Sequence, residues 1–193
     1  VDDSVVDGDR TSTITISVDD DNSDDDFDVV TDVVVNVQTS DNEVAGFAVT
    51  ETGGTTVVSE SGTTDTIDVV LTAQPEADVV VIVTGSNSSE AAVDTGQLTF
   101  TFANWDTPQT VTVIGIDDSI IDGPQTSHVT FSIDDTNSDD HFDLLADQIV
   151  FVTTNDNETV TIQGTKFDDV DGDGVHDGGE PARHLQPNGN QLP

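Results

Sequence analysis

The chain has 193 residues and a formal net charge of −37, because 40 Asp and Glu residues face only 3 Lys and Arg. Such a charge excludes a basic nucleic-acid-binding surface, and its self-repulsion opposes a compact fold unless cations or high salt offset it. The absence of Cys excludes disulfides and thiolate metal sites. No apolar run is long enough to span a bilayer and no signal peptide is recognisable, so we expect an internal portion of a longer protein.

Asp dominates the acidic residues, since only seven of them are Glu. The short Asp side chain suits turns and close metal cages better than a general solvating coat, which favours bound cations. Salt-adapted proteins are also acidic and poor in Lys, so adaptation to high salt stays open as an alternative.

An internal repeat organises the sequence. Residues 1–43 align without a gap with residues 116–158, at an offset of 115 residues, and more than half of the aligned positions are identical. A period near 115 is the length of one immunoglobulin-like sandwich. We therefore expect residues 1–43 to be the C-terminal half of one β-sandwich repeat and residues 44–158 to be a complete repeat. Residues 159–193 begin a different module.

The complete repeat shows about seven strand signals separated by Gly, Asp, Asn and Pro clusters. Val, Ile and Thr are abundant, as is typical of strands, and no segment has a sustained helical period. The sequence predicts an all-β fold of tandem immunoglobulin-like antiparallel β-sandwich modules with calcium-binding loops. The predicted strands are 46–51 and 55–60 (one split strand), 65–73, 77–85, 97–102, 108–116, 127–133 and 147–153.

Two of these strands alternate cleanly between apolar and polar residues. Leu98, Phe100 and Phe102 share one face of the strand at 97–102, which we expect to be the core face. In the strand at 127–133 the predicted core face carries Val129, Phe131 and Ile133.

The segment DVDGDGVHDGGE, residues 169–180, fits a twelve-residue calcium loop. Alternate residues of such a curled loop point oxygen atoms at the ion, and Gly174 permits the tight turn. A flexible Asp-Gly linker that binds nothing is the alternative. No flanking helices are evident, so we expect the loop without an EF-hand. Its predicted ligands are Asp169, Asp171, Asp173, the carbonyl of Val175, Asp177 through water, and Glu180.

Acidic residues also follow two predicted strands of the complete repeat. In a sandwich such loops can meet at one pole, and converging carboxylates repel each other unless a cation lies between them. A solvated acidic loop is the alternative. The residues concerned are Asp117, Asp118 and Asp122 in one loop and Asp156, Asn157 and Glu158 in the other.

A third acidic loop, residues 134–143, recurs as residues 19–28. It either binds metal through Asp134, Asp135, Asp139 and Asp140 or is a polar hairpin that Phe142 anchors to the core. Trp105 lies in a predicted loop, where we expect it to cover the end of the sandwich rather than to bind a ligand.

Several segments together resemble a known family. GFAVTETGG, VVSESGTTDTIDVVLTAQPEADVVV, LTFTFANWDTPQTVTVIGIDDSIIDG and TTNDNE resemble the Calx-beta and related cadherin-like tandem repeats of large bacterial surface proteins. The resemblance covers nearly all of residues 1–158, and it implies extracellular modules that bind Ca²⁺ through acidic loops near their junctions. The following segment, TIQGTKFDDVDGDGVHDGGEP, resembles the start of the B-type module of serine-aspartate-repeat adhesins.

The resemblance also implies a set of calcium ligands, carried over by position. In the complete repeat they are Glu51, Glu60, Asp117, Asp118, Asp122, Asp156, Asn157 and Glu158; in the half repeat they are Asp2, Asp3, Asp7, Asp41, Asn42 and Glu43.

No catalytic motif is present, and we expect no enzymatic activity: the sequence has no GxSxG elbow, no phosphate-binding glycine loop and no Cys nucleophile. The predicted function is an extracellular, cell-surface region of calcium-binding structural or adhesive repeats in a large surface protein or filament. Calcium would make the junctions between modules rigid. The predicted partners are calcium ions, neighbouring modules, and identical chains in a filament or surface layer. The alternative is a non-catalytic accessory region of a secreted multidomain enzyme.

Overall fold

The computed structural model describes residues 3–160, 166–167 and 182–183. The chain divides into two compact units, Val1–Asn157 and Glu158–Pro193. In the second unit the described residues form β12 (Lys166–Phe167) and β13 (Ala182–Arg183), which pair antiparallel. The predicted calcium loop at 169–180 lies outside the described residues.

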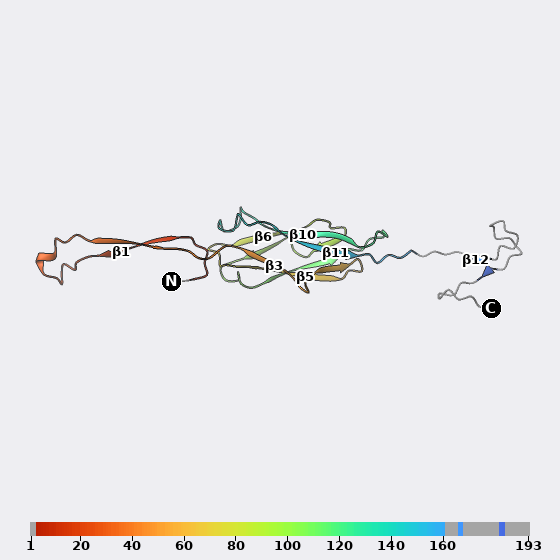
Figure 1. The fold of residues 1–193 in the computed structure, drawn as a ribbon, viewed down its shortest axis with the longest axis horizontal. Coiled ribbons are helices and arrows are strands. Elements are labelled where there is room, and N and C mark those ends of the chain that lie inside the picture. The colour runs from red at the N-terminus through yellow and green to blue at the C-terminus, as the bar shows by residue number, and fades with distance from the viewer. Residues whose placement is uncertain (1–2, 161–165, 168–181, 184–193) are drawn as a thin grey trace. The chain divides into compact units, whose positions relative to one another are not determined.

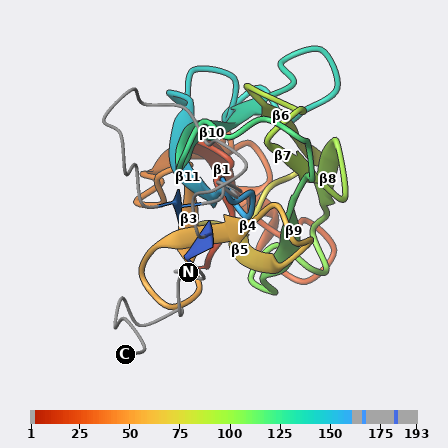
Figure 2. The same ribbon diagram turned by 90° about the vertical axis from the view of Figure 1, so that its right-hand side faces the viewer.

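Residues 44–157 form a two-layer β-sandwich, which confirms the predicted all-β class (Figure 1). One layer is a five-stranded sheet in the order β4-β11-β10-β6-β8, and the other is a four-stranded sheet in the order β3-β5-β9-β7. Figure 2 shows β3, β5 and β9 on one side and β6, β10 and β11 on the other. The strands are β3 (Phe47–Glu51), β4 (Thr56–Ser59), β5 (Thr64–Leu71), β6 (Val79–Gly85), β7 (Ala91–Val93), β8 (Gln97–Phe100), β9 (Gln109–Gly115), β10 (Gln125–Ile133) and β11 (Gln148–Asn155).

The core lies between the two sheets and follows from the period-two patterns of the strands. In β6, Val79, Val81 and Val83 face inward and are at most 4% exposed. Val111 and Val113 of β9 enter the same core from the opposite sheet and are fully buried. Each such side chain contributes about 1.5–3 kcal/mol through its burial, so the core is the main source of stability. Trp105 packs against this core, as predicted.

The prediction that Phe102 faces the core is wrong, although Leu98 and Phe100 do. The strand β8 ends at Phe100, and Phe102 is 57% exposed. The side-chain oxygen of Asn104 accepts hydrogen bonds from both the amide and the hydroxyl of Thr101, which turns the chain before Phe102 could continue the strand.

The strand β7 was not predicted. It has only three residues, too few for alternation to be visible in the sequence, and it pairs with the end of β9.

Residues 10–39 form an antiparallel hairpin of β1 (Arg10–Ile16) and β2 (Val33–Thr39), with a short 3₁₀ turn, η1 (Asp25–Phe27), in the connection. The segment before β1 contacts the sandwich. Val5 forms an isolated parallel bridge with Gln74, and the amide of Gln74 donates a hydrogen bond to the carbonyl of Ser4 at 2.8 Å. Arg10 forms an ion pair with Glu76. The hairpin is therefore tied to the sandwich at its base.

Candidate cation-binding site

Three acidic loop segments meet at one end of the sandwich because of the strand directions. Strands β4 and β11 run parallel, with Ser59 opposite Asn155, so their carboxyl ends lie side by side. The amide of Glu60, the residue after β4, donates to the carbonyl of Asn155 at 3.1 Å. The last residue of β9, Gly115, lies directly against the backbone of Ser59. Glu60 is thereby brought to the loop that follows β9.

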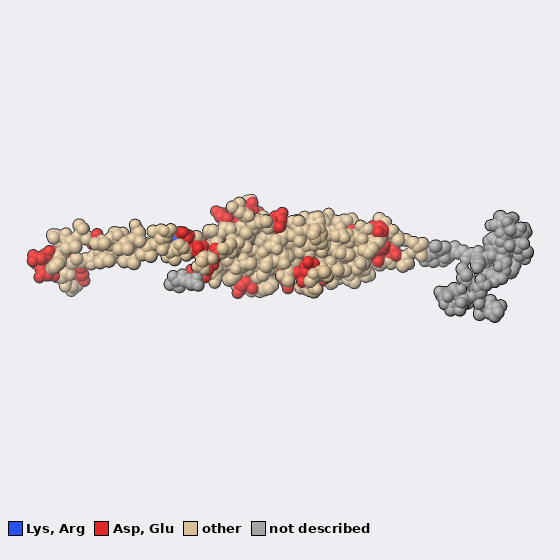
Figure 3. Space-filling model, in the orientation of Figure 1, with Lys and Arg blue, Asp and Glu red and all other residues tan. Residues whose placement is uncertain are grey.

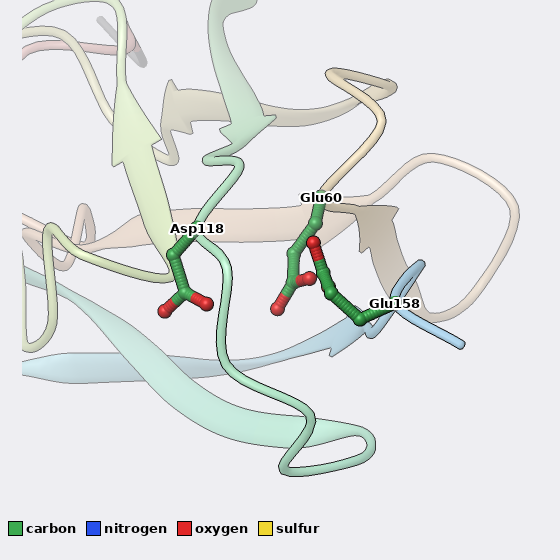
Figure 4. Close-up of side chains that lie close together, drawn as sticks. All are labelled: Glu60, Asp118 and Glu158. Carbon is green, nitrogen blue, oxygen red and sulfur yellow. The ribbon is translucent and has the colours of Figure 1, made fainter. Parts of the chain in front are cut away.

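Glu60 is the central residue of this end. It is 1% exposed; among the described residues its Oε1 atom has no hydrogen-bond partner, and its Oε2 atom accepts only a long bond of 3.4 Å from the amide of Asn157. One carboxylate oxygen each from Glu60, Asp118 and Glu158 lie within 4.8 Å of one another, and Figure 4 shows these side chains together. Because Ca²⁺–oxygen bonds measure about 2.3–2.6 Å, two ligands of one ion lie at most about 5 Å apart. The spacing therefore fits the ligands of a single calcium ion.

Hydrogen bonds to predicted ligands hold the loops around Glu60, Asp118 and Glu158 in place. Asp118 accepts the amide of Ile120 at 2.6 Å, and Asp156 accepts the amide of Gly123 at 2.7 Å. The side-chain amide of Asn157 donates to Asp117 at 2.9 Å, which joins the loop after β9 to the loop after β11. The structure thus brings the two predicted acidic loops together.

Glu90, which the sequence analysis did not single out, is a second buried acid at this end. It is 7% exposed and its Oε2 atom has no hydrogen-bond partner among the described residues. Burial raises the pKa of Glu90, and the charges of Asp122, Asp118, Glu60 and Asp156 raise it further. The burial of Glu90 could not be predicted from the sequence, because a single Glu before a three-residue strand forms no recognisable pattern.

Glu51 is not in the group formed by Glu60, Asp118 and Glu158. Its Oε2 atom accepts a hydrogen bond from the hydroxyl of Thr56 at 2.9 Å, across the turn between β3 and β4. A hydroxyl partner satisfies this carboxylate without a cation, in contrast to Glu60.

The predicted ligands of the half repeat line a separate pocket of about 170 Å³. The loop geometry repeats here: Asp3 accepts the amide of Val5 at 3.0 Å, and Asp41 accepts the amide of Gly8 at 2.6 Å. Amide hydrogen bonds, first from Glu43 and then from Gly8, lower the pKa of Asp41 to about 2. Asp3, Asp7, Asp41, Asn42 and Glu43 line the pocket, and Asp2 lies outside the described residues.

A positive charge distinguishes this second pocket. Arg10 stands where the repeat places Gln125, and its Nε atom lies 2.6 Å from Asp7. The guanidinium offsets part of the negative charge that a cation would otherwise balance.

The third acidic loop is joined by hydrogen bonds to the segment before β6. Asp139 is 4% exposed and accepts the amides of Glu76 and Ala77 at 2.7 and 2.9 Å. Phe142 is fully buried and belongs to the core cluster, as the hairpin interpretation predicted. Asp139 therefore fastens this loop to the segment before β6.

Acidic side chains gather at the loop regions in the view of Figure 3, whereas the surface between them consists mainly of uncharged residues. Among the described residues, no helix is long and apolar enough to cross a membrane.

No protein-family model matches the sequence, and no curated protein matches it. The similar solved structures include the periplasmic chaperone SfaE (9% identity, TM-score 0.42, covering 61% of this chain and 60% of that one). They also include the apo form of the Calx CBD1 domain (14%, 0.40, 58% and 98%). A third is the surface layer protein SbsC, domains 1–6 (13%, 0.44, 95% and 20%). The chain thus spans less than two thirds of the length of SfaE and a fifth of the length of SbsC domains 1–6. Because each TM-score is below 0.5, we base the function on the side chains of the site.

Proposed function

We propose that this chain is an extracellular, cell-surface region of calcium-binding structural repeats, in which Ca²⁺ makes the ends of the modules rigid. The observation that carries the proposal is the burial of the Glu60 carboxylate. A carboxylate that is 1% exposed, with one oxygen lacking a partner and Asp118 beside it, is costly unless a cation balances it. Glu90 adds a second buried carboxylate at the same end.

The donor set supports Ca²⁺ among the common metal ions. All candidate ligands at this end are oxygen atoms, from carboxylates and from the side chain of Asn157, and the chain contains no Cys. Zn²⁺ favours nitrogen and sulfur ligands, and Mg²⁺ demands a strict octahedron and keeps several waters. Ca²⁺ takes six to eight oxygen ligands in flexible geometry, which suits a crowded group of carboxylates.

The positions of the ligands on the chain support a structural role. Glu60 follows β4, Asp118 follows β9, and Asn157 is the last residue of the sandwich unit. An ion held here would link three segments that are distant in the sequence and would fix the path by which the chain leaves the sandwich. Binding to the folded state alone adds about 2.7 kcal/mol of stability when free Ca²⁺ is 100 times its Kd. Extracellular modules with Kd of about 10⁻⁴–10⁻³ M are suited to such a role. The proposed partners are neighbouring modules and identical chains in a filament or surface layer.

The proposal is tested by thermal unfolding of the wild-type chain in 2 mM CaCl₂ and in EDTA, with NaCl added to equal ionic strength. We expect Ca²⁺ to raise Tm by several degrees and Mg²⁺ to raise it less. Glu60→Gln should remove most of this calcium-dependent shift, because it takes away the buried charge. The matched control is Glu51→Gln, which should keep the shift. Equal Tm values in CaCl₂ and in NaCl would support adaptation to salt and contradict the proposal.

A further inference from the structure

The hairpin β1–β2 repeats β10–β11 with the same strand register. Seven residue pairs connect β1 and β2, from Arg10–Thr39 to Ile16–Val33. The seven pairs of β10 and β11, from Gln125–Thr154 to Phe131–Gln148, are the same set displaced by 115 residues. The hairpin is therefore the structural equivalent of the second half of the sandwich.

One face of the hairpin carries the equivalents of core residues, and no other part of the described chain covers it. In β10 and β11 the inward residues are at most 7% exposed: Ser127, Val129, Phe131, Val150, Val152 and Thr154. Their equivalents are Ser12, Ile14, Ile16, Val35, Val37 and Thr39, of which four are identical to their counterparts. Yet Ile14 is 55% exposed, Ile16 60%, Val35 43% and Val37 37%. These side chains have the identity of core residues and the exposure of surface residues.

Two aromatic side chains of the outward face do not recur on the hairpin. His128 corresponds to Thr13 and Phe151 to Asn36, so the aromatic pair that His128 and Phe151 form on the sandwich has no counterpart on the hairpin. The apolar character of the inward positions is thus retained, whereas two outward aromatic side chains are replaced by polar ones.

The loop at the tip of the hairpin shows the same difference. Phe142 is fully buried, whereas its equivalent Phe27 is 57% exposed. Asp139 accepts two amide hydrogen bonds from the segment before β6, whereas its equivalent Asp24 accepts the amide of Asp26 in its own loop. The loop of the hairpin thus has the equivalents of both anchoring residues, Phe27 and Asp24. Among the described residues, no equivalent of the core or of the segment before β6 lies beside them.

The complete sandwich shows what covers such a hairpin. Strand β4 pairs parallel with β11, and β6 pairs antiparallel with β10, so both edges of the second half are occupied by strands of the first half. We propose that the inward face and both edges of the β1–β2 hairpin are a docking surface for a polypeptide equivalent to residues 44–116, which supplies strands like β4 and β6.

Two other occupants are disfavoured by the amount of surface they would bury. The hairpin could enter the sandwich of a second copy only by displacing β10–β11, which would expose an equal apolar face and give no net gain. Two hairpins packed face to face would bury from each copy only the apolar side chains of one narrow face, Ile14, Ile16, Val33, Val35 and Val37, and would leave both edges of each hairpin without strand partners.

The test extends the full chain by placing a copy of residues 44–116 directly before Asp2, because residue 117 is the equivalent of residue 2. Hydrogen exchange is then measured by mass spectrometry for residues 10–39, with residues 125–154 of the same chain as the internal reference. We expect residues 10–39 to exchange rapidly in the original chain. In the extended chain their exchange should slow by at least tenfold, toward that of residues 125–154.

A control variant of the extended chain carries Ile14→Asp and Val37→Asp. It should keep rapid exchange at residues 10–39 while residues 125–154 stay protected, which distinguishes docking from a general effect of the added segment. Rapid exchange at residues 10–39 in the extended chain without these substitutions would overturn the proposal. Protection in the original chain that grows with protein concentration would show that a second copy is the occupant, and would overturn it as well.

Discussion

Ser59 and Gly115 lie so close together that a Cβ atom on residue 115 would come within 2.1 Å of the carbonyl oxygen of Ser59. No side chain fits in this space, so only glycine allows the end of β9 to lie against the end of β4. The contact places Glu60, the residue after Ser59, beside the loop that carries Asp118. A backbone contact thereby sets the position of the central carboxylate.

Gly115→Ala should disturb both the fold and the cation site. The added methyl group must displace the backbone of Ser59, at a cost of about 1–3 kcal/mol. Glu60 would shift with it, so the calcium-dependent rise in Tm should shrink. The control is Gly96→Ala, because a Cβ at residue 96 meets no atom within 4 Å. Thermal unfolding with and without Ca²⁺ measures both effects; equal Tm values for the two variants would contradict the packing argument.

Glu90→Gln should stabilise the calcium-free protein at neutral pH. Burial and the neighbouring carboxylates raise the pKa of Glu90 above its ordinary value of 4.5. Below pH 4.5 the acid is protonated in both states, and stability is lost as the pH rises through the raised pKa, because the folded state resists ionisation. In EDTA the variant should therefore exceed the wild type in Tm at pH 7 and match it near pH 4. A variant less stable than the wild type at pH 7 in EDTA would show that the Glu90 charge is compensated by other contacts.

Asp139→Asn should destabilise the sandwich, because the carboxylate of Asp139 joins its loop to the segment before β6. Burial alone would raise the pKa of Asp139, but the amides of Ala77, His141 and Glu76 together hold it below the ordinary 3.8. The stabilisation that the ionised carboxylate of Asp139 provides is present above pH 3.8 and is lost as the pH falls through the lowered pKa. At pH 7 we expect a loss of about 1–3 kcal/mol in the free energy of unfolding by urea.

The control for Asp139 is Asp135→Asn in the same loop, where the side chain is exposed, and it should change stability by less than about 0.5 kcal/mol. If the two variants unfold at the same urea concentration, the amide contacts of Asp139 do not stabilise the loop.

Phe142 and Phe27 occupy equivalent positions of the repeat and should respond very differently to truncation. Phe142→Ala removes a fully buried ring from the core and should cost about 3–5 kcal/mol in the free energy of unfolding. Phe27→Ala removes a ring that is 57% exposed and should change stability by less than about 0.5 kcal/mol. Denaturant unfolding of both variants measures the contrast. A large loss for Phe27→Ala would mean that the hairpin is already covered in solution.

The sequence predicted features that depend on local pattern or on the repeat. Val129 and Phe131 alternate with polar residues, and the core face of β10 follows from that alternation. The two acidic loops each follow a predicted strand and were expected to meet at one pole of the sandwich, and Asn157 and Asp117 do join them. Phe102 was misplaced because β8 ends early, where the amide of Thr101 donates a hydrogen bond to the side-chain oxygen of Asn104, and alternation does not encode this contact.

Tertiary contacts decided the features that the sequence did not predict. The burial of Glu90 depends on how the turn before β7 packs, and its carbonyl accepts the amide of Ile116 at 2.8 Å. Asp139 meets the amides of Glu76 and Ala77 across about sixty residues of sequence. No short-range pattern distinguishes these acids from the many exposed ones in a chain with 40 of them.

The most direct test of calcium binding at Glu60 is isothermal titration calorimetry of the wild-type chain and Glu60→Gln with CaCl₂ at constant ionic strength. We predict saturable binding to the wild type with at least one site that Glu60→Gln loses and Glu51→Gln retains. Identical titrations of the wild type and Glu60→Gln, or no saturable heat up to 10 mM Ca²⁺, would contradict the proposed role of this buried carboxylate.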